Sequence, residues 1–452
     1  MQIVLVGCGK VGSALAKKII DEGHNITVVD TCAERVRRVT EELDVMGIVG
    51  NGSSISVLSQ AGIETADVFI SVTGSDELNL LCCLFARKAA NCQTIARVRN
   101  PLFNTEIEFI KNQLGISAII NPELATAREI SRLLRFPSAI KIDTFANGLV
   151  DLIKFELTEE MSLCGLSLKE IPLNFGNNIL ICAVERGHNV TIPSGDFVLK
   201  AGDILTFLAT RDNATAFFKQ LHLSIRPAKN ALLVGGGTIG FYLAKDLLEH
   251  HINVRIVEQN PSKCEDLAEA LPDATILQGD GTDRQLLMEE GLTAAEAFVP
   301  LTNLDEENIL LSLFAKKHSK AKIVTKINRL EFDDIVDSLD IGSIIYPKYI
   351  TCDFIVQHIR AMQNESGNKI KTLYRILDDR VEALEFTVHT PSVATDKPLA
   401  ELKLKPNQLI CCISRGNQII IPKGSDNIQV GDSVVMVTLE KGLQDIRDIV
   451  AK

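Results

Sequence analysis

The sequence predicts an α/β protein built from two tandem Rossmann-like doubly wound parallel sheets, each followed by a small α+β lobe. Three observations predict this fold. Short buried apolar strands alternate with amphipathic helices, a glycine-rich loop follows the first strand, and the whole pattern occurs twice along the chain. The composition agrees, because 46% of the 452 residues are hydrophobic and 23% are charged, as in globular proteins.

The duplication is visible as matching strings that keep the same order to the end of both halves. The seam between the halves lies near Arg226-Pro227. The matching pairs are Gly7-Cys8-Gly9-Lys10-Val11-Gly12 with Gly235-Gly236-Gly237-Thr238-Ile239-Gly240, Asp30 with Glu258, Gly50-Asn51-Gly52-Ser53 with Gly279-Asp280-Gly281-Thr282, Thr73-Gly74-Ser75-Asp76-Glu77-Leu78-Asn79 with Thr302-Asn303-Leu304-Asp305-Glu306-Glu307-Asn308, Ile119-Ile120-Asn121-Pro122 with Ile344-Ile345-Tyr346-Pro347, Arg186-Gly187 with Arg415-Gly416, and Gly202-Asp203 with Gly431-Asp432.

The first part of each half is predicted to form the parallel sheet. Amphipathic stretches at Val11–Glu22 and Glu34–Leu43 are expected to be crossover helices, which parallel strands require. A further helix, Glu123–Leu134, begins after Pro122 and ends before Pro137. The predicted strands of the first half are Gln2–Val6, Asn25–Val29, Val45–Val49, Val68–Val72, Thr94–Val98 and Ala118–Ile120.

The second part of each half is strand-rich. Leu180–Val184 and Asn189–Ile192 flank the turn Arg186-Gly187, and Ile204–Ala209 follows a second turn, which predicts a small α+β lobe. The polar run 364–369 is expected to be a linker. The expected domains are the Rossmann lobes 1–137 and 228–363 and the small lobes 138–225 and 368–452.

The first glycine loop stands between a strand and a helix, where a dinucleotide site needs it. Gly7 permits the tight turn, Gly9 lets a pyrophosphate approach the backbone, and Gly12 lets the helix pack against the strand. Asp30 ends the second strand about 20 residues further on, and its carboxylate would accept ribose hydroxyls and repel a 2′-phosphate. This favours NAD or an adenosine nucleotide over NADP. The alternative is a tight turn without a ligand.

The second loop repeats this pattern with Gly235, Gly237, Gly240 and Glu258. A duplicated half can keep a loop's shape after losing its ligand, so the alternative of a bare turn carries more weight here.

Other polar residues follow the predicted strands. Asn51 and Ser53, matched by Asp280 and Thr282, lie beside the adenine end of a dinucleotide, or they simply form a turn. Thr73-Gly74 ends the fourth strand, at the crevice where open α/β sheets bind ligands.

Two charged residues lie near the same crevice. Asp76 is expected to be a helix N-cap, with a ligand group as the alternative. Arg97 could reach a phosphate from the fifth strand or form a surface ion pair.

Several classes of function are excluded or disfavoured. The formal net charge of −11 and the lack of a basic stripe disfavour nucleic-acid binding. No apolar run is long enough for a membrane helix. The 11 cysteines form no Cys-x-x-Cys or zinc spacing, so we expect reduced packing residues in the cytoplasm and no metal site.

No catalytic constellation is found in the sequence. The two halves share no histidine, and neither a Gly-x-Ser-x-Gly elbow nor a Walker lysine motif occurs. The sequence therefore favours ligand binding without turnover, and the chain is not expected to be an enzyme.

The duplicated strings, followed by a small β-rich lobe with Arg-Gly and Gly-Asp turns, resemble the RCK (regulator of potassium conductance) family over essentially the whole chain. The resemblance implies NAD(H) or ATP/ADP bound in the Rossmann lobes. The contacts it implies are Gly7, Cys8, Gly9, Lys10, Val11, Asp30, Thr73, Gly74 and Arg97 in the first half, and Gly235, Gly236, Gly237, Thr238, Ile239, Glu258, Thr302 and Lys326 in the second.

The resemblance also implies a cytoplasmic regulator and its partners. These are a membrane potassium-translocating subunit of the Trk type, with which the regulator lies peripherally on the cytoplasmic face, and further copies of the chain in a dimer or a tetrameric ring. Asn303 in place of Gly74, and Glu258 in place of Asp30, leave the second ligand open. An NAD-dependent oxidoreductase and a ligand-free scaffold are the alternatives.

Overall fold

The computed structural model describes residues 1–104, 106–136, 138–146, 149–176, 178–187, 189–223, 227–328, 339, 341–363, 370–376, 380–416, 418–440, 443 and 445–451. The predicted linker 364–369 lies outside the described residues. The chain forms two compact units, one from Met1–Ser131 with Ala228–Val356 and the other from Arg132–Pro227 with Gln357–Lys452. Each unit therefore combines corresponding parts of the two halves.

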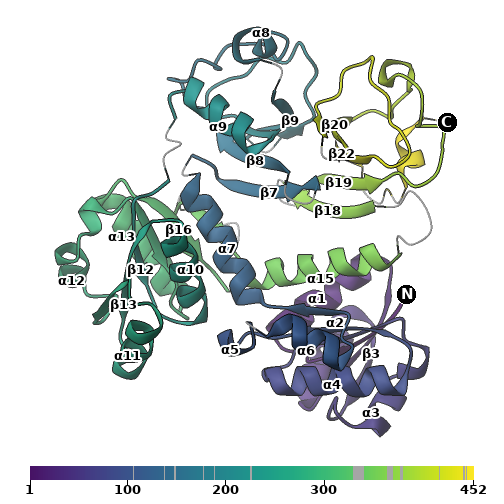
Figure 1. Cartoon of the computed structure of the whole chain (residues 1–452), viewed down its shortest axis with the longest axis vertical. Helices are drawn as coiled ribbons and strands as arrows, with labels where there is room; N and C mark the ends of the chain where they lie inside the picture. Colours follow the sequence, from purple (N-terminus) through teal and green to yellow (C-terminus); the bar gives the residue numbers. More distant parts are fainter. Residues whose placement is uncertain are drawn as a thin grey trace. The chain divides into compact units, whose positions relative to one another are not determined.

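The first unit contains two six-stranded parallel sheets (Figure 1). The sheet of the first half has the order β3-β2-β1-β4-β5-β6, in which the chain starts in the middle and winds to both edges. Its elements are β1 Gln2–Val6, α1 Lys10–Asp21, β2 Asn25–Asp30, α2 Ala33–Leu43, β3 Met46–Val49, α3 Ile55–Gln60, β4 Val68–Ser71, α4 Asp76–Ala89, β5 Gln93–Arg97, α5 Pro101–Asn104, α6 Ile107–Leu114, β6 Ala118–Ile120 and α7 Pro122–Arg135.

The sheet of the second half repeats this topology with the order β14-β13-β12-β15-β16-β17. Its strands pair in parallel throughout. Its elements are β12 Asn230–Val234, α10 Thr238–Glu249, β13 Asn253–Glu258, α11 Pro261–Ala270, β14 Thr275–Gln278, α12 Arg284–Glu289, β15 Ala297–Pro300, α13 Asp305–His318, β16 Lys322–Lys326, β17 Ser343–Ile345 and α15 Pro347–Gln363.

The second unit contains two five-stranded antiparallel sheets, β10-β9-β11-β8-β7 and β18-β19-β22-β20-β21. One core cluster takes side chains from both sheets, including Phe145 and Cys182 from the first and Cys411 and Val437 from the second. The elements are β7 Lys141–Phe145, β8 Val150–Glu156, α8 Ile171–Phe175, β9 Leu180–Arg186, β10 Asn189–Thr191, β11 Ile204–Ala209, α9 Arg211–Gln220, β18 Ile370–Ile376, β19 Val381–Thr387, β20 Gln408–Arg415, β21 Gln418–Ile420 and β22 Ser433–Thr438.

The fold class predicted from the sequence is confirmed. The central strands β1 and β4 are buried apolar runs, as strands covered on both faces must be. Helix α4 shows why the crossovers form where they do: the Ser75 side chain accepts the N–H of Leu78 at its start, acidic residues occupy its first turn, and Arg87 and Lys88 occupy its last. None of the described helices combines the length and the apolarity that spanning a membrane would take.

Candidate functional site

The glycine loop of the first half connects β1 to α1 at the carboxyl edge of the sheet, the edge at which the parallel strands end. Gly7 has a φ of +105°, which favours glycine, and a Cβ on Gly12 would lie only 1.8 Å from the carbonyl oxygen of Gly7. By contrast, a Cβ on Gly9 would have nothing within 4 Å. Gly7 and Gly12 are therefore required by the turn itself, whereas Gly9 faces open space.

The start of α1 is suited to an anion. Gly9 is its N-cap and supplies no side chain, so the first backbone N–H groups of the helix have no side-chain cap in this part of the structure. Lys10, the first residue of the helix, is exposed, and Val11 is half-buried. Uncapped N–H groups and the positive end of the helix dipole together attract phosphate.

Asp30 lies at the end of β2, as predicted, and its carboxylate binds the loop backbone. Oδ2 accepts the N–H of Cys8 over 2.7 Å, and Oδ1 accepts the N–H of Cys32 over 2.9 Å. The side chain is buried, but an ionised carboxylate has about four acceptor positions, so both oxygens can still accept ribose hydroxyls. Burial, together with the negative charge of Asp30, raises the pKa of the Cys8 thiol to about 12, so this thiol stays neutral.

Glu258 reproduces these contacts in the second half with a longer side chain. Its Oε2 accepts the N–H of Gly236 over 2.8 Å, and its Oε1 accepts the N–H of Asn260 over 2.9 Å. A Cβ on Gly236 would lie 2.3 Å from Leu267 and 3.2 Å from Glu258 Oε2. Glycine at 236, where the first half has Cys8, therefore makes room for the larger neighbours.

The second loop otherwise matches the first. Gly235 has a φ of +108°, and a Cβ on Gly237 would have nothing within 4 Å. Gly237 is the N-cap of α10 and gives no side-chain hydrogen bond to it. Thr238 and Ile239 form the first turn of this helix, Thr238 being exposed and Ile239 half-buried. Both halves therefore present an open glycine and an uncapped helix start.

Asn51 and Asp280 form turns. Asn51 Oδ1 accepts the backbone N–H of Ser53 over 3.0 Å and its hydroxyl over 2.9 Å. Asp280 Oδ1 accepts the same two groups of Thr282 over 2.9 and 2.8 Å, and the backbone hydrogen bond lowers the pKa of the Asp280 carboxyl. Both side chains remain exposed beside the sheet edge, so a turn and a ligand contact are compatible at these positions.

In each half, one buried asparagine holds the residues at the ends of the fourth and fifth strands, where the sequence predicts a ligand crevice, and the sequence suggested no role for it. The first crevice is bordered by Thr73, Gly74 and Arg97, and the second by Thr302, Asn303 and Lys326. Asn79 is fully buried; its Oδ1 accepts the N–H of Thr73 over 2.8 Å and its hydroxyl over 2.7 Å, while its Nδ2 donates to the carbonyl of Arg97 over 2.8 Å. Asn308 makes the same contacts with Thr302 and Lys326. The signal in the sequence that could have indicated this role is that asparagine stands at both matching positions of the repeat.

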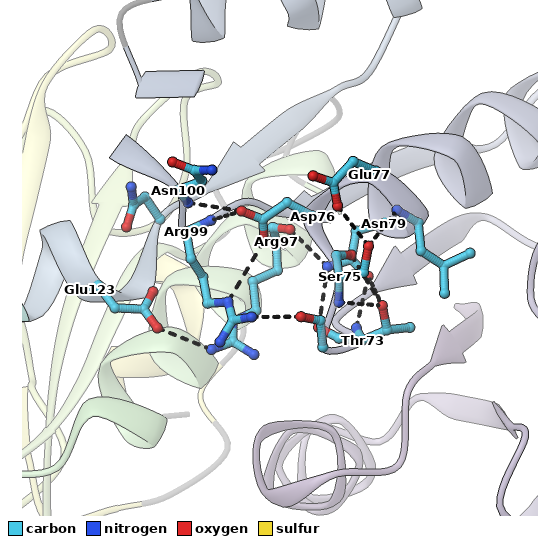
Figure 2. A network of polar contacts seen from close by, with 12 residues as sticks. Thr73, Ser75, Asp76, Glu77, Asn79, Arg97, Arg99, Asn100 and Glu123 are labelled. Atoms are coloured by element: carbon cyan, nitrogen blue, oxygen red, sulfur yellow. Dashed lines mark hydrogen bonds and ion pairs between the residues drawn. The ribbon is translucent and has the colours of Figure 1, made fainter. Parts of the chain in front are cut away.

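The prediction that Asp76 is a helix N-cap is wrong. Ser75, one residue earlier, is the N-cap of α4, and Asp76 is its first helical residue. The Asp76 carboxylate is buried and Oδ2 accepts the backbone N–H groups of Arg99 and Asn100 over 2.9 and 2.8 Å, as Figure 2 shows. Asp76 therefore fixes the segment that follows β5.

Gly74 lies at the exposed rim of this crevice. Its carbonyl accepts a hydrogen bond from Arg99 Nη2 over 2.6 Å, and a Cβ at this position would have nothing within 4 Å. Asn303, which takes its place in the second half, is exposed as well. The two crevices therefore differ at the rim by one polar side chain.

Arg97 forms an ion pair, but not at the surface. Its Nη2 lies 3.3 Å from Glu123 Oε1 of α7 (Figure 2), and both side chains are more than four-fifths buried. Burial lowers the pKa of the Arg97 guanidinium, which the nearby Glu123 charge opposes. Arg97 Nε and Glu123 Oε2 are buried with no hydrogen-bond partner in the described structure. Both groups therefore retain capacity for a further polar ligand.

Lys326 occupies the place of Arg97 in the second half. It ends β16, is only 4% exposed, and donates from Nζ to the carbonyl of Leu301 over 3.1 Å. Burial lowers its pKa to about 8, against the attraction of Asp305 and Glu123.

Tyr242 links the two sheets of the first unit, a contact that the sequence did not predict. It belongs to α10, and its hydroxyl accepts Asn121 Nδ2 over 2.9 Å and donates to the carbonyl of Arg99 over 3.3 Å. The helix that follows the second glycine loop therefore contacts the segment fixed by Asp76.

In the part of the chain that the structure describes, no three His, Cys, Asp or Glu side chains are arranged to hold a metal ion. The polar groups gathered at each sheet edge are instead helix N–H groups, a carboxylate that binds the glycine loop, a threonine and a basic side chain. This set matches the phosphates and ribose of a nucleotide.

Comparison with solved structures agrees with the fold. The GsuK channel aligns over 97% of this chain and 76% of that chain with a TM-score of 0.65 at 18% identity. The GsuK RCK domain aligns over 96% of this chain and 92% of that chain with a TM-score of 0.63.

Comparison of sequences gives the family. The TrkA-N domain model matches residues 3–122 and 231–347, and the TrkA-C domain model matches residues 152–222 and 383–451. A Trk system potassium uptake protein TrkA homolog of Methanosarcina mazei is 32% identical, with 99% of each chain covered. The TrkA of Halomonas elongata is 32% identical, covering 99% of this chain and 98% of its own. The chain therefore belongs to the TrkA family, with the TrkA-N and TrkA-C domains present twice in tandem.

Proposed function

We propose that this chain is a cytoplasmic, nucleotide-sensing regulatory subunit of a Trk-type potassium transporter. It binds NAD(H) or ATP/ADP in its Rossmann lobes and thereby gates a membrane potassium-translocating subunit, to which it is peripheral. It acts without catalytic turnover and as a dimer or tetrameric ring. Its domains are the lobes 1–137, 138–225, 228–363 and 368–452.

One observation carries the nucleotide assignment. At each sheet edge, a glycine with open space at its Cβ position lies at a helix start that has no side-chain cap; these glycines are Gly9 and Gly237. A carboxylate beside each loop, from Asp30 and Glu258, accepts a backbone N–H of the loop. A bare turn needs Gly7 and Gly12, but it does not need open space at Gly9. The open space fits a pyrophosphate.

The comparisons support the choice of ligand and partner. Structures described as the GsuK channel bound to NAD and as GsuK bound to ADP share this fold at 18% and 16% identity. Relatives 32% identical to this chain are named potassium uptake proteins of the Trk system. Regulation of potassium uptake by nucleotides is the function that joins these two lines of support.

The first experiment is a thermal-shift series on the purified full chain with NAD, NADH, ATP and ADP. A ligand that binds only the folded state raises the melting temperature, by an amount that grows with its concentration. We expect at least one of the four to do so, and the Gly9→Val/Gly237→Val double variant to lose the shift. If none of the four nucleotides shifts the melting temperature, the ligand-free scaffold is the alternative that remains. A substrate-dependent change in NADH absorbance would favour an oxidoreductase.

A further inference from the structure

Lys326 ends β16, at the carboxyl edge of the sheet that also carries the second glycine loop. Its Nζ donates to the carbonyl of Leu301, the residue that follows β15. The same carbonyl oxygen would lie 3.1 Å from a Cβ on Gly235, so it touches the turn that begins the loop. A lysine ammonium has three donors, and this contact uses one of them. The amine is thus held at the carboxyl edge of the sheet, the edge at which open α/β sheets bind ligands, against the residue that packs on the first glycine of the loop.

The first crevice is different in kind. Arg97 stands at the matching position, and its guanidinium is paired with Glu123 at 3.3 Å. An arginine does not lose its proton in proteins, whereas a buried lysine readily does. The two crevices therefore combine the same loop geometry with basic groups that respond differently to pH.

We propose that ligand binding in the second lobe is coupled to proton uptake at Lys326, so that this crevice accepts a phosphate-bearing ligand only when the amine is protonated. The first lobe, with Arg97, binds without this coupling. The inference rests on the proposed function, because it assumes that the second loop receives a nucleotide. It adds a pH-dependent difference between two otherwise similar sites.

The surroundings of the amine determine the direction of the effect. Burial disfavours the charged form and lowers the Lys326 pKa to about 8. The charged groups that face the Lys326 amine are Asp305 of α13 and Glu123 of α7. Both favour the protonated amine, but they do not bring its pKa back to the ordinary value of a lysine. The anionic phosphate of a bound ligand would raise the pKa again, so binding takes up a proton at pH values above about 8.

The size of the effect follows from this linkage. At pH 7 most of the free protein already carries the proton, and at pH 9 about nine-tenths of it does not. The apparent affinity of the second crevice should therefore fall about tenfold between pH 7 and pH 9. ADP is a suitable probe, because the last ionisation of a phosphate monoester lies near pH 6 and its charge hardly changes over this range.

The experiment is isothermal titration calorimetry of ADP binding to the full chain at pH 7 and pH 9, in two buffers of different ionisation enthalpy. We expect one class of site that weakens about tenfold and takes up close to one proton per ADP at pH 9. Lys326→Arg should keep that site and abolish both effects. Lys326→Met, which keeps the volume but removes the charge, should weaken the site at both pH values.

One further variant is a matched control, and another tests the converse substitution in the first crevice. Lys322→Arg changes a lysine on the same strand whose pKa burial also lowers to about 8, but at the other end of β16, roughly 13 Å away. It should leave the proton uptake unchanged. Arg97→Lys tests whether the lysine alone is enough to introduce coupling in the first crevice.

Three results would overturn the inference. If ADP binds without proton uptake at pH 9, the inference is refuted and the proposed function stands. Proton uptake that survives Lys326→Arg and disappears with Lys322→Arg would assign the coupling elsewhere. If the full chain binds no ADP at either pH, the inference fails, and if it also binds none of NAD, NADH and ATP, the proposed function fails as well.

Discussion

The carboxylate of Asp30 and the backbone N–H of Cys8 form a hydrogen bond of 2.7 Å that fixes the glycine loop against the end of β2. Glu258 holds the N–H of Gly236 at 2.8 Å in the second half. The acidic residue that we propose as the ribose acceptor is thus also part of the loop's own structure. A change at this residue should therefore affect both the proposed ligand contact and the loop itself.

We predict that Asp30→Ala weakens NAD binding to the first lobe by about 1–3 kcal/mol, the usual cost of losing a hydrogen bond to a charged group. The loop N–H of Cys8 would lose its acceptor at the same time. Titration calorimetry of the full chain measures the change. Glu41→Lys, an exposed charge on α2, is the control and should leave the affinity unchanged. Wild-type affinity in Asp30→Ala would remove Asp30 from the site.

The glycines of the first loop provide a matched pair of variants. We predict that Gly9→Val abolishes nucleotide binding to the first lobe and leaves the melting temperature close to that of the wild type, because a Cβ there meets nothing within 4 Å. Gly12→Val should instead prevent stable folding, because its Cβ would lie 1.8 Å from the Gly7 carbonyl oxygen. Circular dichroism melting and calorimetry separate the two effects. An unfolded Gly9→Val protein would mean that this glycine serves only the turn.

The comparison of prediction and structure shows which features depend on local sequence. Strands such as Gln2–Val6 and Ile204–Ala209 were predicted at their observed bounds, because a buried apolar run between turns has few alternatives. Asp76 was predicted as an N-cap because Ser75 and Asp76 are both suitable cap residues and local sequence does not choose between them. The carboxylate's actual partners are the N–H groups of Arg99 and Asn100, brought close only by the fold.

The crevice itself depends on contacts that are distant in sequence. The bond from Asn121 to Tyr242 joins the two halves of the chain, and periodicity within one half contains no information about it. Arg97 was predicted to lie in the fifth strand, Thr94–Val98, and it ends β5 in the structure, but its pairing with Glu123 required the position of α7. Sequence patterns gave the loops and strand ends, whereas the partners of the buried polar groups needed the tertiary structure.

We predict that Asn79→Ala destabilises the first unit by about 2–3 kcal/mol. The variant removes the side chain that accepts the N–H of Thr73 and donates to the carbonyl of Arg97, so both backbone groups lose this partner. Asn308→Ala should cost a similar amount, because Asn308 makes the same contacts. Urea unfolding of each variant measures the loss. A change below 0.5 kcal/mol, ordinary for surface substitutions, would contradict the positioning role.

In the second unit, Arg186 binds Asp203 through two hydrogen bonds of 2.6 and 2.8 Å, and Arg415 binds Asp432 in the same way. Burial alone raises the pKa of the Asp203 carboxyl, but the hydrogen bonds from Arg186 and Lys200 outweigh it, so the pKa is lowered. A carboxyl whose pKa is lower in the folded state stabilises the protein at pH values above its unfolded pKa near 4.

We therefore predict that this stabilisation begins to decline as the pH falls below about 4 and is lost as the pH falls through the lowered pKa of Asp203 in the folded state. Asp203→Asn should lower stability by about 1–3 kcal/mol at pH 7 and by less at pH 3. Melting temperatures of wild type and variant at the two pH values test this. An equal difference at both values would show that the charge of Asp203 does not matter.

The last prediction concerns regulation. A ligand can gate a transporter only if it binds one conformation of the regulator more tightly than the other. The two crevices differ in three places: Asp30 and Glu258, Gly74 and Asn303, and Arg97 and Lys326. We therefore expect charge reversal in the two lobes to have unequal effects on potassium uptake.

Asp30→Lys should abolish the nucleotide response, because it places a cation against the Cys8 N–H and removes the buried ribose acceptor. Glu258→Lys should only modulate the response, because the second crevice depends on a different basic group and carries a side chain at its rim. The measurement is potassium uptake in cells that lack their own regulator and are complemented with each variant, with Glu41→Lys as the exposed-charge control. Complete loss in both lobes would refute the asymmetry, and wild-type uptake from both would refute the sensing role itself.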